Sequence, residues 1–369
     1  MMAKSFRKMF YNRIKFFTVA ILLLPSCGDS GRPAGEEERV VTDVLGREVV
    51  VPENIESVVG LRAGALRLLV YMDAVPLIVG IEEPEKRDSR PYTEAYPRLK
   101  ELPAIGPSMG GDPEMIMNAE PDVIFKTYTT ASDADQLQAK TGIPVIALEC
   151  TDLGRDTETL LKSLEVAGNV IQREERADSL ASYIRQTISE LDARTKDIAP
   201  RQKPSVYVGG ISYSGSYGLS ATHHRFAPFL LVNANNVAAG IDSRLISHVR
   251  GTFVDIEKIM YWDPDYIFVD KAGLSLVARD LETKPALAGS LKAVENEKIF
   301  TLLPYNNYAT NYEYVILNSW FTGKLLYPER FEDVDFDDIT TEVLEMFYNR
   351  EADMADSFKV FKRLSGQSF

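Results

Sequence analysis

Short hydrophobic runs alternate with longer amphipathic stretches along most of the chain. The runs are rich in Val, Ile and Leu, and they lie at residues 56–60, 77–81, 144–148, 205–209 and 298–302. Stretches with the apolar spacing of helices separate most of these runs. Because strands that alternate with helices form parallel sheets with helices on both faces, the pattern predicts an α/β fold.

One part of this pattern occurs twice. Residues 112–125 and 255–268 both contain Asp-x-Glu-x-Ile, then four residues, then Pro-Asp-x-Ile-Phe. In each copy the first Asp is a candidate helix N-cap, and the Glu falls in the first helical turn, where a carboxylate is favourable. The proline ends the helix and a short hydrophobic strand follows it. The two copies lie too far apart in sequence for a solenoid repeat, so the duplication predicts two similar lobes.

A long helical stretch separates the two copies. Residues 156–198 contain no proline, and Leu180, Ile184, Ile188 and Leu191 recur at spacings of three and four residues. Such spacing defines one apolar face of a helix. We therefore expect residues 156–200 to form a rigid connecting region rather than a flexible linker.

The N-terminus has the features of an export signal. Residues 4–15 hold five basic side chains and no acid, and residues 16–24 are apolar apart from one threonine. The apolar run is too short to span a bilayer, which indicates a signal peptide over residues 1–26. The residues that end at Cys27 resemble a bacterial lipobox, so we expect Cys27 to be lipidated and residues 27–40 to form a flexible tether. The alternative is an ordinary secretory signal beside an incidental cysteine.

Composition and motifs narrow the function classes. The formal net charge is -13, which disfavours nucleic acid as a partner because its binders need clustered Lys and Arg. The chain has no nucleophile elbow, zinc-protease motif, P-loop or dinucleotide-binding glycine motif. We therefore expect no enzymatic activity and no cofactor. Cys150 has no histidine near it in sequence and is expected to be an inert thiol.

The chain resembles the class III periplasmic binding proteins, which capture ferric siderophores, haem and cobalamin for ABC importers. The resemblance rests on the signal and lipobox, both duplicated units, the central helix, and residues 57–60, 79–81 and 207–210. It implies two Rossmann-like lobes, joined by a single long α-helix, with the ligand cleft between them. The lobes would be residues 41–155 and 201–330, with a C-terminal helical tail over residues 331–369.

The resemblance also implies partners. The chain would act as a monomer on the periplasmic side of a bacterial membrane, held there by its lipid. It would bind a small metal–organic ligand and deliver it to a permease dimer with its ATPase. Glu114 and Glu257, the duplicated acids, would dock onto arginines of the permease. A first-turn Glu also stabilises its own helix, so a purely structural role is the alternative.

Candidate ligand-binding residues lie in loops that follow the predicted strands. Basic residues in these positions could make a cationic cleft for an anionic chelate, and aromatic and polar residues of the second lobe could wrap the ligand. The set consists of Arg62, Lys126, Tyr128, Tyr213, Tyr217, His223, His224, Lys271, Tyr305, Asn306 and Tyr308. A solvated loop with aromatic residues covering the core is the alternative. We expect the adjacent side chains of His223 and His224 to diverge, so the pair alone would be a poor chelate.

The leading hypothesis for the ligand is an iron chelate, similar to a ferric siderophore. Cobalamin and haem are alternatives within the same class. A chelatase-like enzyme of the same two-lobed architecture and a lipoprotein scaffold with a vestigial cleft are alternatives of other classes.

Overall fold

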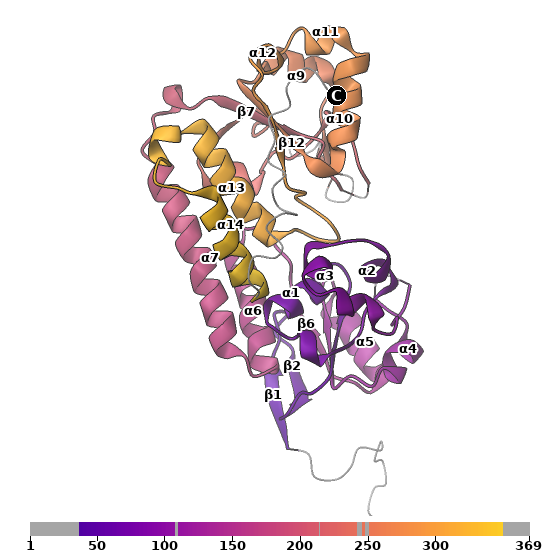
Figure 1. The fold of residues 1–369 in the computed structure, drawn as a ribbon. Helices are drawn as coiled ribbons and strands as arrows, with labels where there is room; N and C mark the ends of the chain where they lie inside the picture. The colour runs from indigo at the N-terminus through magenta and orange to yellow at the C-terminus, as the bar shows by residue number, and fades with distance from the viewer. Residues whose placement is uncertain (1–36, 108–109, 214, 242–245, 248–250, 350–369) are drawn as a thin grey trace, which may run out of the picture. The chain divides into compact units, whose positions relative to one another are not determined.

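Two parallel sheets form the framework of the chain. The computed structural model describes residues 37–107, 110–213, 215–241, 246–247 and 251–349 (Figure 1). The N-terminal sheet has the strand order β4 (Ile78–Gly80), β3 (Val58–Leu61), β5 (Val123–Lys126), β6 (Val145–Ala147). The C-terminal sheet has the order β9 (Asn235–Asn236), β7 (Ser205–Gly209), β12 (Tyr266–Asp270), β13 (Ile299–Leu302). The α/β prediction and the predicted strands are therefore confirmed.

The two sheets share one topology. In each sheet the first strand in sequence pairs with both the second and the third, and the third also pairs with the fourth, all in parallel. The strand of the duplicated unit, β5 or β12, is the third in both sheets. The internal repeat therefore extends from a sequence motif to the arrangement of the strands.

A serine–aspartate pair at the start of the strands is also repeated. The Asp122 carboxylate accepts hydrogen bonds from the amides of Glu56 and Ser57, both at 2.8 Å, and the Asp122 amide donates to the Ser57 hydroxyl at 3.0 Å. In the second sheet the Asp265 carboxylate accepts from the Ser205 amide at 2.7 Å, and the Asp265 amide donates to the Ser205 hydroxyl at 3.0 Å. Each aspartate of a Pro-Asp pair thus ties the third strand to the first.

Short helices surround each sheet. Those of the N-terminal half are α1 (Ala65–Tyr71), α2 (Glu83–Arg87), α3 (Pro91–Ala95), α4 (Pro113–Asn118) and α5 (Ala131–Thr141). Those of the C-terminal half are α8 (Ala227–Leu231), α9 (Ile256–Trp262), α10 (Leu274–Thr283), α11 (Pro285–Ala288) and α12 (Lys292–Glu295). Short 3-10 turns occur at Val75–Leu77, Pro97–Glu101, Pro200–Gln202, Lys271–Gly273 and Pro328–Arg330.

The predicted central helical stretch consists of two helices. Helix α6 spans Thr157–Val170 and α7 spans Glu174–Thr195, and between them Gln172 has a left-handed backbone, with φ of 56°. Near the start of α7, the Arg176 side chain donates to the Tyr71 carbonyl at 2.8 Å. Near its end, Arg194 pairs with Asp333 at 2.7 Å. Helix α7 therefore contacts elements of both halves and is the candidate connecting helix.

Two further helices pack along α7. The chain leaves β13 and forms α13 (Tyr312–Leu326) and then α14 (Phe336–Tyr348), both of which contact α7 (Figure 1). Helix α14 lies within the predicted helical tail, and residues 350–369 of that tail lie outside the described chain. No described helix combines the length and the apolarity needed to cross a membrane.

Two antiparallel parts of the fold were not predicted. An antiparallel hairpin, β1 (Glu38–Thr42) with β2 (Glu48–Pro52), begins inside the range expected for the tether. A small antiparallel sheet in the C-terminal half consists of β8 (Ala221–Thr222), β11 (Gly251–Phe253) and β10 (Ile246–Ser247). The first hairpin fixes the chain to the N-terminal half, because its buried Val41, Val49 and Val51 belong to the main core.

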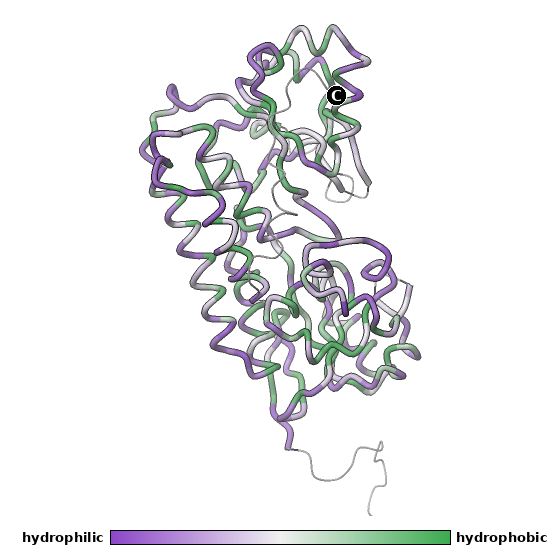
Figure 2. Tube along the Cα trace, in the orientation of Figure 1, coloured by the Kyte–Doolittle hydropathy of each residue, from purple (hydrophilic) through white to green (hydrophobic). Residues whose placement is uncertain are grey.

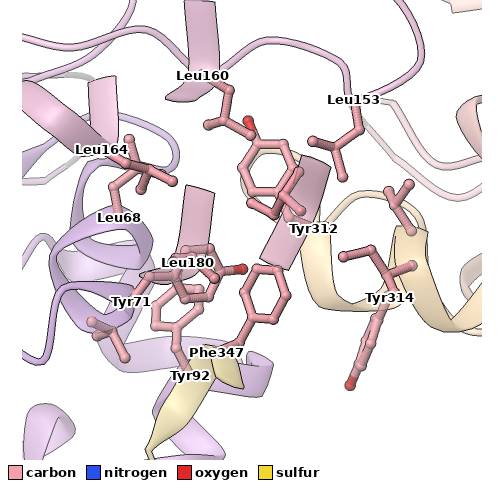
Figure 3. Close-up of a cluster of buried hydrophobic side chains, with 14 of the residues drawn as sticks. Leu68, Tyr71, Tyr92, Leu153, Leu160, Leu164, Leu180, Tyr312, Tyr314 and Phe347 are labelled. Carbon is pink, nitrogen blue, oxygen red and sulfur yellow. The ribbon is translucent and has the colours of Figure 1, made fainter. Parts of the chain in front are cut away.

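The largest hydrophobic core lies where helices of both halves meet. Leu68 of α1, Leu160 and Leu164 of α6, Leu180 of α7 and Phe347 of α14 all belong to it, and Figure 3 shows their side chains gathered around buried tyrosines. A smaller cluster covers the other face of each sheet. Hydropathy along the chain agrees with this arrangement, since the sheet strands are mostly hydrophobic while α7 alternates between polar and apolar residues (Figure 2).

Candidate functional site

The carboxyl end of the N-terminal sheet carries Arg62, Lys126 and Tyr128. These three residues are called the basic group, after its two cationic members. Leu61 and Lys126 are register partners at the carboxyl ends of β3 and β5, and Arg62 follows the first of these strands. The Arg62 guanidinium donates a hydrogen bond to the Tyr128 carbonyl. Because open parallel sheets bind ligands at the carboxyl ends of their strands, this group occupies the expected place for a ligand site.

Lys126 is the most unusual member of the basic group. Its side chain is nearly buried, with 8 % of the residue exposed. Burial, and then the nearby charge of Arg62, lower the pKa of its ammonium group. No oxygen in the described part of the chain accepts a hydrogen bond from that ammonium group. An ammonium group without an acceptor among the described residues can pair with an anion, so the site favours an anionic ligand.

Tyr305, His223 and His224 form part of an aromatic group in the C-terminal half. The Tyr305 ring is 5.5 Å from the His223 ring and 4.8 Å from the Phe226 ring. Only 2 % of Tyr305 is exposed, and its hydroxyl donates to the Asp152 carboxylate at 2.5 Å. Asp152 belongs to the loop after β6, so this hydrogen bond joins the two halves of the chain.

The expectation that the histidine side chains diverge is wrong. The two imidazole rings are stacked, with centroids 5.7 Å apart and planes inclined by 10°. A turn follows β8 at this point, so the period of a strand or helix does not set the direction of the side chains. Burial lowers the pKa of His223 to about 4, opposed by the charge of Asp152. His223 is therefore neutral at ordinary pH, the state in which imidazole can bind a metal.

Tyr213 and Tyr217 complete the aromatic group. Both contact Phe253, at ring distances of 6.2 Å and 4.9 Å. The Tyr213 hydroxyl donates to the Thr222 carbonyl at 2.5 Å, and its ring packs against Gly251, where a Cβ atom would clash with it. Phe253 is 40 % exposed, which is high for a large apolar side chain. The aromatic group therefore presents an apolar surface at the edge of the C-terminal half.

The loop of residues 303–311, between β13 and α13, connects the basic and aromatic groups. The Asn306 side chain donates to the Ser212 carbonyl at 3.1 Å, next to Tyr213. The Tyr308 hydroxyl donates to the Glu82 carboxylate of the N-terminal half at 2.8 Å. Asp270 fixes the start of this loop, since its carboxylate accepts from the Tyr305 amide at 2.8 Å. The loop therefore joins the aromatic group to Glu82 of the N-terminal half, whereas Lys271 is exposed in a turn after β12.

Four residues around these groups were not predicted from the sequence: Arg67, Glu82, Asp152 and Phe253. Arg67 and Glu82 are completely buried and contact the 303–311 loop from the N-terminal half. A signal was present for Arg67, because it is the only charge in the apolar run of residues 65–72. Glu82 begins an acidic stretch that is typical of a solvated surface, so its burial had no local signal.

Glu114 and Glu257 occupy equivalent places outside the ligand groups. Each lies in the first turn of the helix before the third strand, α4 or α9, and each is exposed. Asp112 caps α4 through its side chain, as predicted, whereas Asp255 takes the N-cap position of α9 without a side-chain hydrogen bond. Exposed apolar residues accompany both acids, Met115 and Met117 on α4 and Tyr261 on α9.

The described residues include neither a cluster of metal ligands nor the predicted lipidation site. The described residues contain no group of three or more His, Cys, Asp or Glu side chains that could hold a metal ion. Cys27 and the predicted signal peptide lie outside the described chain. Cys150 is a free thiol, and burial raises its pKa to about 11, which makes it a poor nucleophile.

Solved structures show the same fold. The molybdate-bound MolA structure of Haemophilus influenzae aligns with a TM-score of 0.67 and 24 % identity, over 85 % of this chain and 99 % of that one. A periplasmic solute-binding protein of Veillonella parvula aligns with a TM-score of 0.70 and 19 % identity, over 88 % and 97 % of the two chains. A Helicobacter pylori CeuE structure with Ni-His aligns with a TM-score of 0.59 and 16 % identity, over 87 % and 99 %.

Sequence comparison gives the family. The molybdate-binding protein MolA of Haemophilus influenzae is 26 % identical over 337 residues, which cover 84 % of this chain and 91 % of MolA. The family model described as periplasmic binding protein matches residues 58–305, which is more than half of the chain. Its members serve ABC importers as binding proteins and are not enzymes. The chain therefore belongs to the periplasmic binding protein family of ABC importers.

Proposed function

We propose that this binding protein captures an anionic metal complex, an iron chelate similar to a ferric siderophore, and delivers it to a permease. The observation that supports an anionic ligand is Lys126, a nearly buried residue near Arg62 whose ammonium group has no acceptor among the described residues. The aromatic group supports an organic component, because its exposed Phe253 and the tyrosine rings beside it offer apolar contact.

We propose individual ligand contacts on the same grounds. Arg62, Lys126 and Tyr128 would bind the anionic part of the ligand, while Tyr213, Tyr217, His223 and His224 would face its organic or metal part. Tyr305, Asn306 and Tyr308 would shape the site through the 303–311 loop, since their side chains already hydrogen bond to Asp152, Ser212 and Glu82. Lys271 is exposed, and we propose that it adds long-range attraction for an anion.

A second candidate ligand is a bare oxyanion such as molybdate. It is favoured by the similarity to the molybdate-binding protein of Haemophilus influenzae, and the buried Lys126 would suit it equally. Cobalamin and haem remain alternatives that would use the aromatic group more than the basic one.

A titration distinguishes these ligands. We expect tyrosine and tryptophan fluorescence of the full chain to change on addition of ferric siderophores, because several candidate contacts are tyrosines. Sodium molybdate, haem and cobalamin serve as competing ligands in the same assay. Saturable binding of molybdate alone would replace the iron chelate with the oxyanion. A folded protein that responds to none of the four would contradict the proposed ligand class.

We also propose that a lipid on Cys27 holds the protein at the membrane as a monomer. The variant Cys27→Ala is expected to leave the membrane fraction and appear among soluble envelope proteins, because the lipid supplies the membrane affinity. Fractionation followed by immunoblotting measures this. Retention of the variant in the membrane pellet after a high-salt wash would contradict lipid anchoring. A Cys150→Ala variant is the matched control and should remain membrane-bound.

A further inference from the structure

Glu82 lies at the point where the two halves of the ligand site meet. The residue is completely buried at the N-cap position of α2. One carboxylate oxygen accepts hydrogen bonds from the Arg62 amide at 2.9 Å and from the Tyr308 hydroxyl at 2.8 Å. The other oxygen accepts from the Gly110 amide at 3.0 Å. A single carboxylate therefore joins three segments that are far apart in sequence.

The three described residues that donate to Glu82 all have a left-handed backbone. The φ angles are 69° at Arg62, 125° at Gly110 and 53° at Tyr308. For Arg62 and Tyr308 this conformation is unfavourable, and it persists only where surrounding contacts fix it. Glu82 supplies such a contact to each of the three residues. Its carboxylate therefore holds together a set of backbone conformations that would relax without it.

Among the described residues, none forms an ion pair with Glu82. In the described parts of the chain its hydrogen bonds come from two amides and a phenol, and no lysine or arginine side chain lies within ion-pair distance. Its field therefore acts on the nearby basic group. Burial and Arg62 lower the pKa of Lys126, whereas Asp133 and Glu82 raise it. Glu82 thus helps to keep Lys126 charged in a site that otherwise disfavours the ammonium form.

We infer that Glu82 is the positioning residue of the ligand site: it fixes Arg62 and Tyr308 in the conformations that present the basic group to an anionic ligand. This inference rests on the proposed function for the identity of the ligand. The positioning of the three segments does not depend on that identity. Glu82 touches no ligand atom in this role, because it is buried behind the residues that it holds.

The variant Glu82→Gln tests this role. A glutamine side chain has one acceptor oxygen, so one of the two oxygen positions would present an NH2 group to an N–H or O–H donor. We expect the affinity for sodium molybdate or ferric enterobactin to fall on the order of tenfold or more, mainly through faster dissociation. Glu83→Gln is the matched control, since Glu83 is adjacent and exposed, and it should bind like the wild type.

The pH dependence separates positioning from simple loss of stability. Anion binding should weaken as pH rises through the pKa of Lys126, because only the ammonium form attracts the anion. Removing the Glu82 charge lowers that pKa further, so the alkaline limb of the binding curve should shift to lower pH in Glu82→Gln. The variant Tyr308→Phe removes one donor but keeps the carboxylate. Its ligand binding should therefore weaken over the same alkaline pH range as that of the wild type. A uniform loss of affinity at every pH in Glu82→Gln would overturn the inferred effect on Lys126.

Hydrogen exchange tests the positioning without a ligand. In the full-length Glu82→Gln protein we expect faster amide exchange around residues 62–64, 110–112 and 307–309 than in the wild type. In Tyr308→Phe only the last segment should exchange faster. Unchanged exchange in all three segments of Glu82→Gln would overturn the positioning role. If the wild type binds neither probe while exchange changes as expected, the proposed ligand class fails and the role of Glu82 stands.

Discussion

Replacing Glu114 and Glu257 together with alanine is expected to reduce ligand uptake about tenfold or more, while ligand affinity stays within about twofold of the wild type. Both acids are exposed in the first turns of α4 and α9, which precede the third strand of their respective sheets. Uptake of labelled ligand in whole cells and pull-down of the permease measure the first effect. Titration of the purified protein measures the second.

The reason for this expectation is the repeated geometry. The same strand order and the same serine–aspartate pair place both helices equivalently in the two halves. Two equivalent acids suit a partner with a two-fold axis, such as a permease dimer with a basic side chain on each subunit. Charges at the rim of an interface mainly set orientation and association rate. Docking of the double variant should therefore also depend less on salt than docking of the wild type.

Matched controls separate docking from helix stability. Loss of a first-turn Glu costs its helix at most about 1 kcal/mol, so the double variant should remain folded. Glu101→Ala with Glu282→Ala removes one exposed acid from each half and should support normal uptake. If Glu114→Ala with Glu257→Ala instead loses ligand and docks normally, the acids belong to the ligand site. If neither property changes, they serve only their helices.

Most of the framework could be predicted because its signals are local. Hydrophobic runs and Pro-Asp pairs placed the main strands of both sheets, and the duplicated unit indicated two related halves. The break between α6 and α7 could not be predicted. Gln172 adopts a left-handed backbone there, and no glycine or proline marks this turn in the sequence. The hairpin of β1 and β2 was missed because its first strand begins directly after a polar, glycine-rich segment.

The candidate site was predicted only in part, for a physical reason. Residues at the ends of strands, such as Arg62 and Lys126, could be found because topology brings strand ends together. Glu82 and Asp152 could not, since their importance comes from hydrogen bonds to Tyr308 and Tyr305, which lie far away in sequence. Such pairings depend on how the two halves pack, and one sequence contains no local pattern for them.

Replacing Arg67 with leucine is expected to lower the free energy of unfolding by about 3–5 kcal/mol. The Arg67 side chain of α1 is completely buried, and its guanidinium group donates to the Asn307 carbonyl at 2.9 Å and to the Asn311 side chain at 2.6 Å. It also donates to the Thr310 carbonyl. Leucine fills similar space but leaves these three acceptors on the 303–311 loop, of which Asn311 is completely buried, without their donor.

Urea unfolding of the full chain measures the loss. Arg185→Leu is the matched control, because Arg185 is an exposed helical arginine whose ion pair with Glu158 is screened by solvent. Arg67→Lys should recover little, since lysine keeps the charge but lacks the planar fork that reaches several acceptors at once. Wild-type stability of Arg67→Leu would show that the 303–311 loop is held mainly by its other contacts.

The loss of stability should appear in ligand binding as well. The acceptors of Arg67 belong to the same loop as Tyr305, Asn306 and Tyr308, which contact Asp152, Ser212 and Glu82. A loop that loses Arg67 is free to leave Glu82, so the basic and aromatic groups would no longer be held together. We therefore expect Arg67→Leu to weaken ligand binding under conditions where the protein is still folded, whereas Arg185→Leu should leave it unchanged. Normal affinity of folded Arg67→Leu would mean that the ligand itself orders the loop.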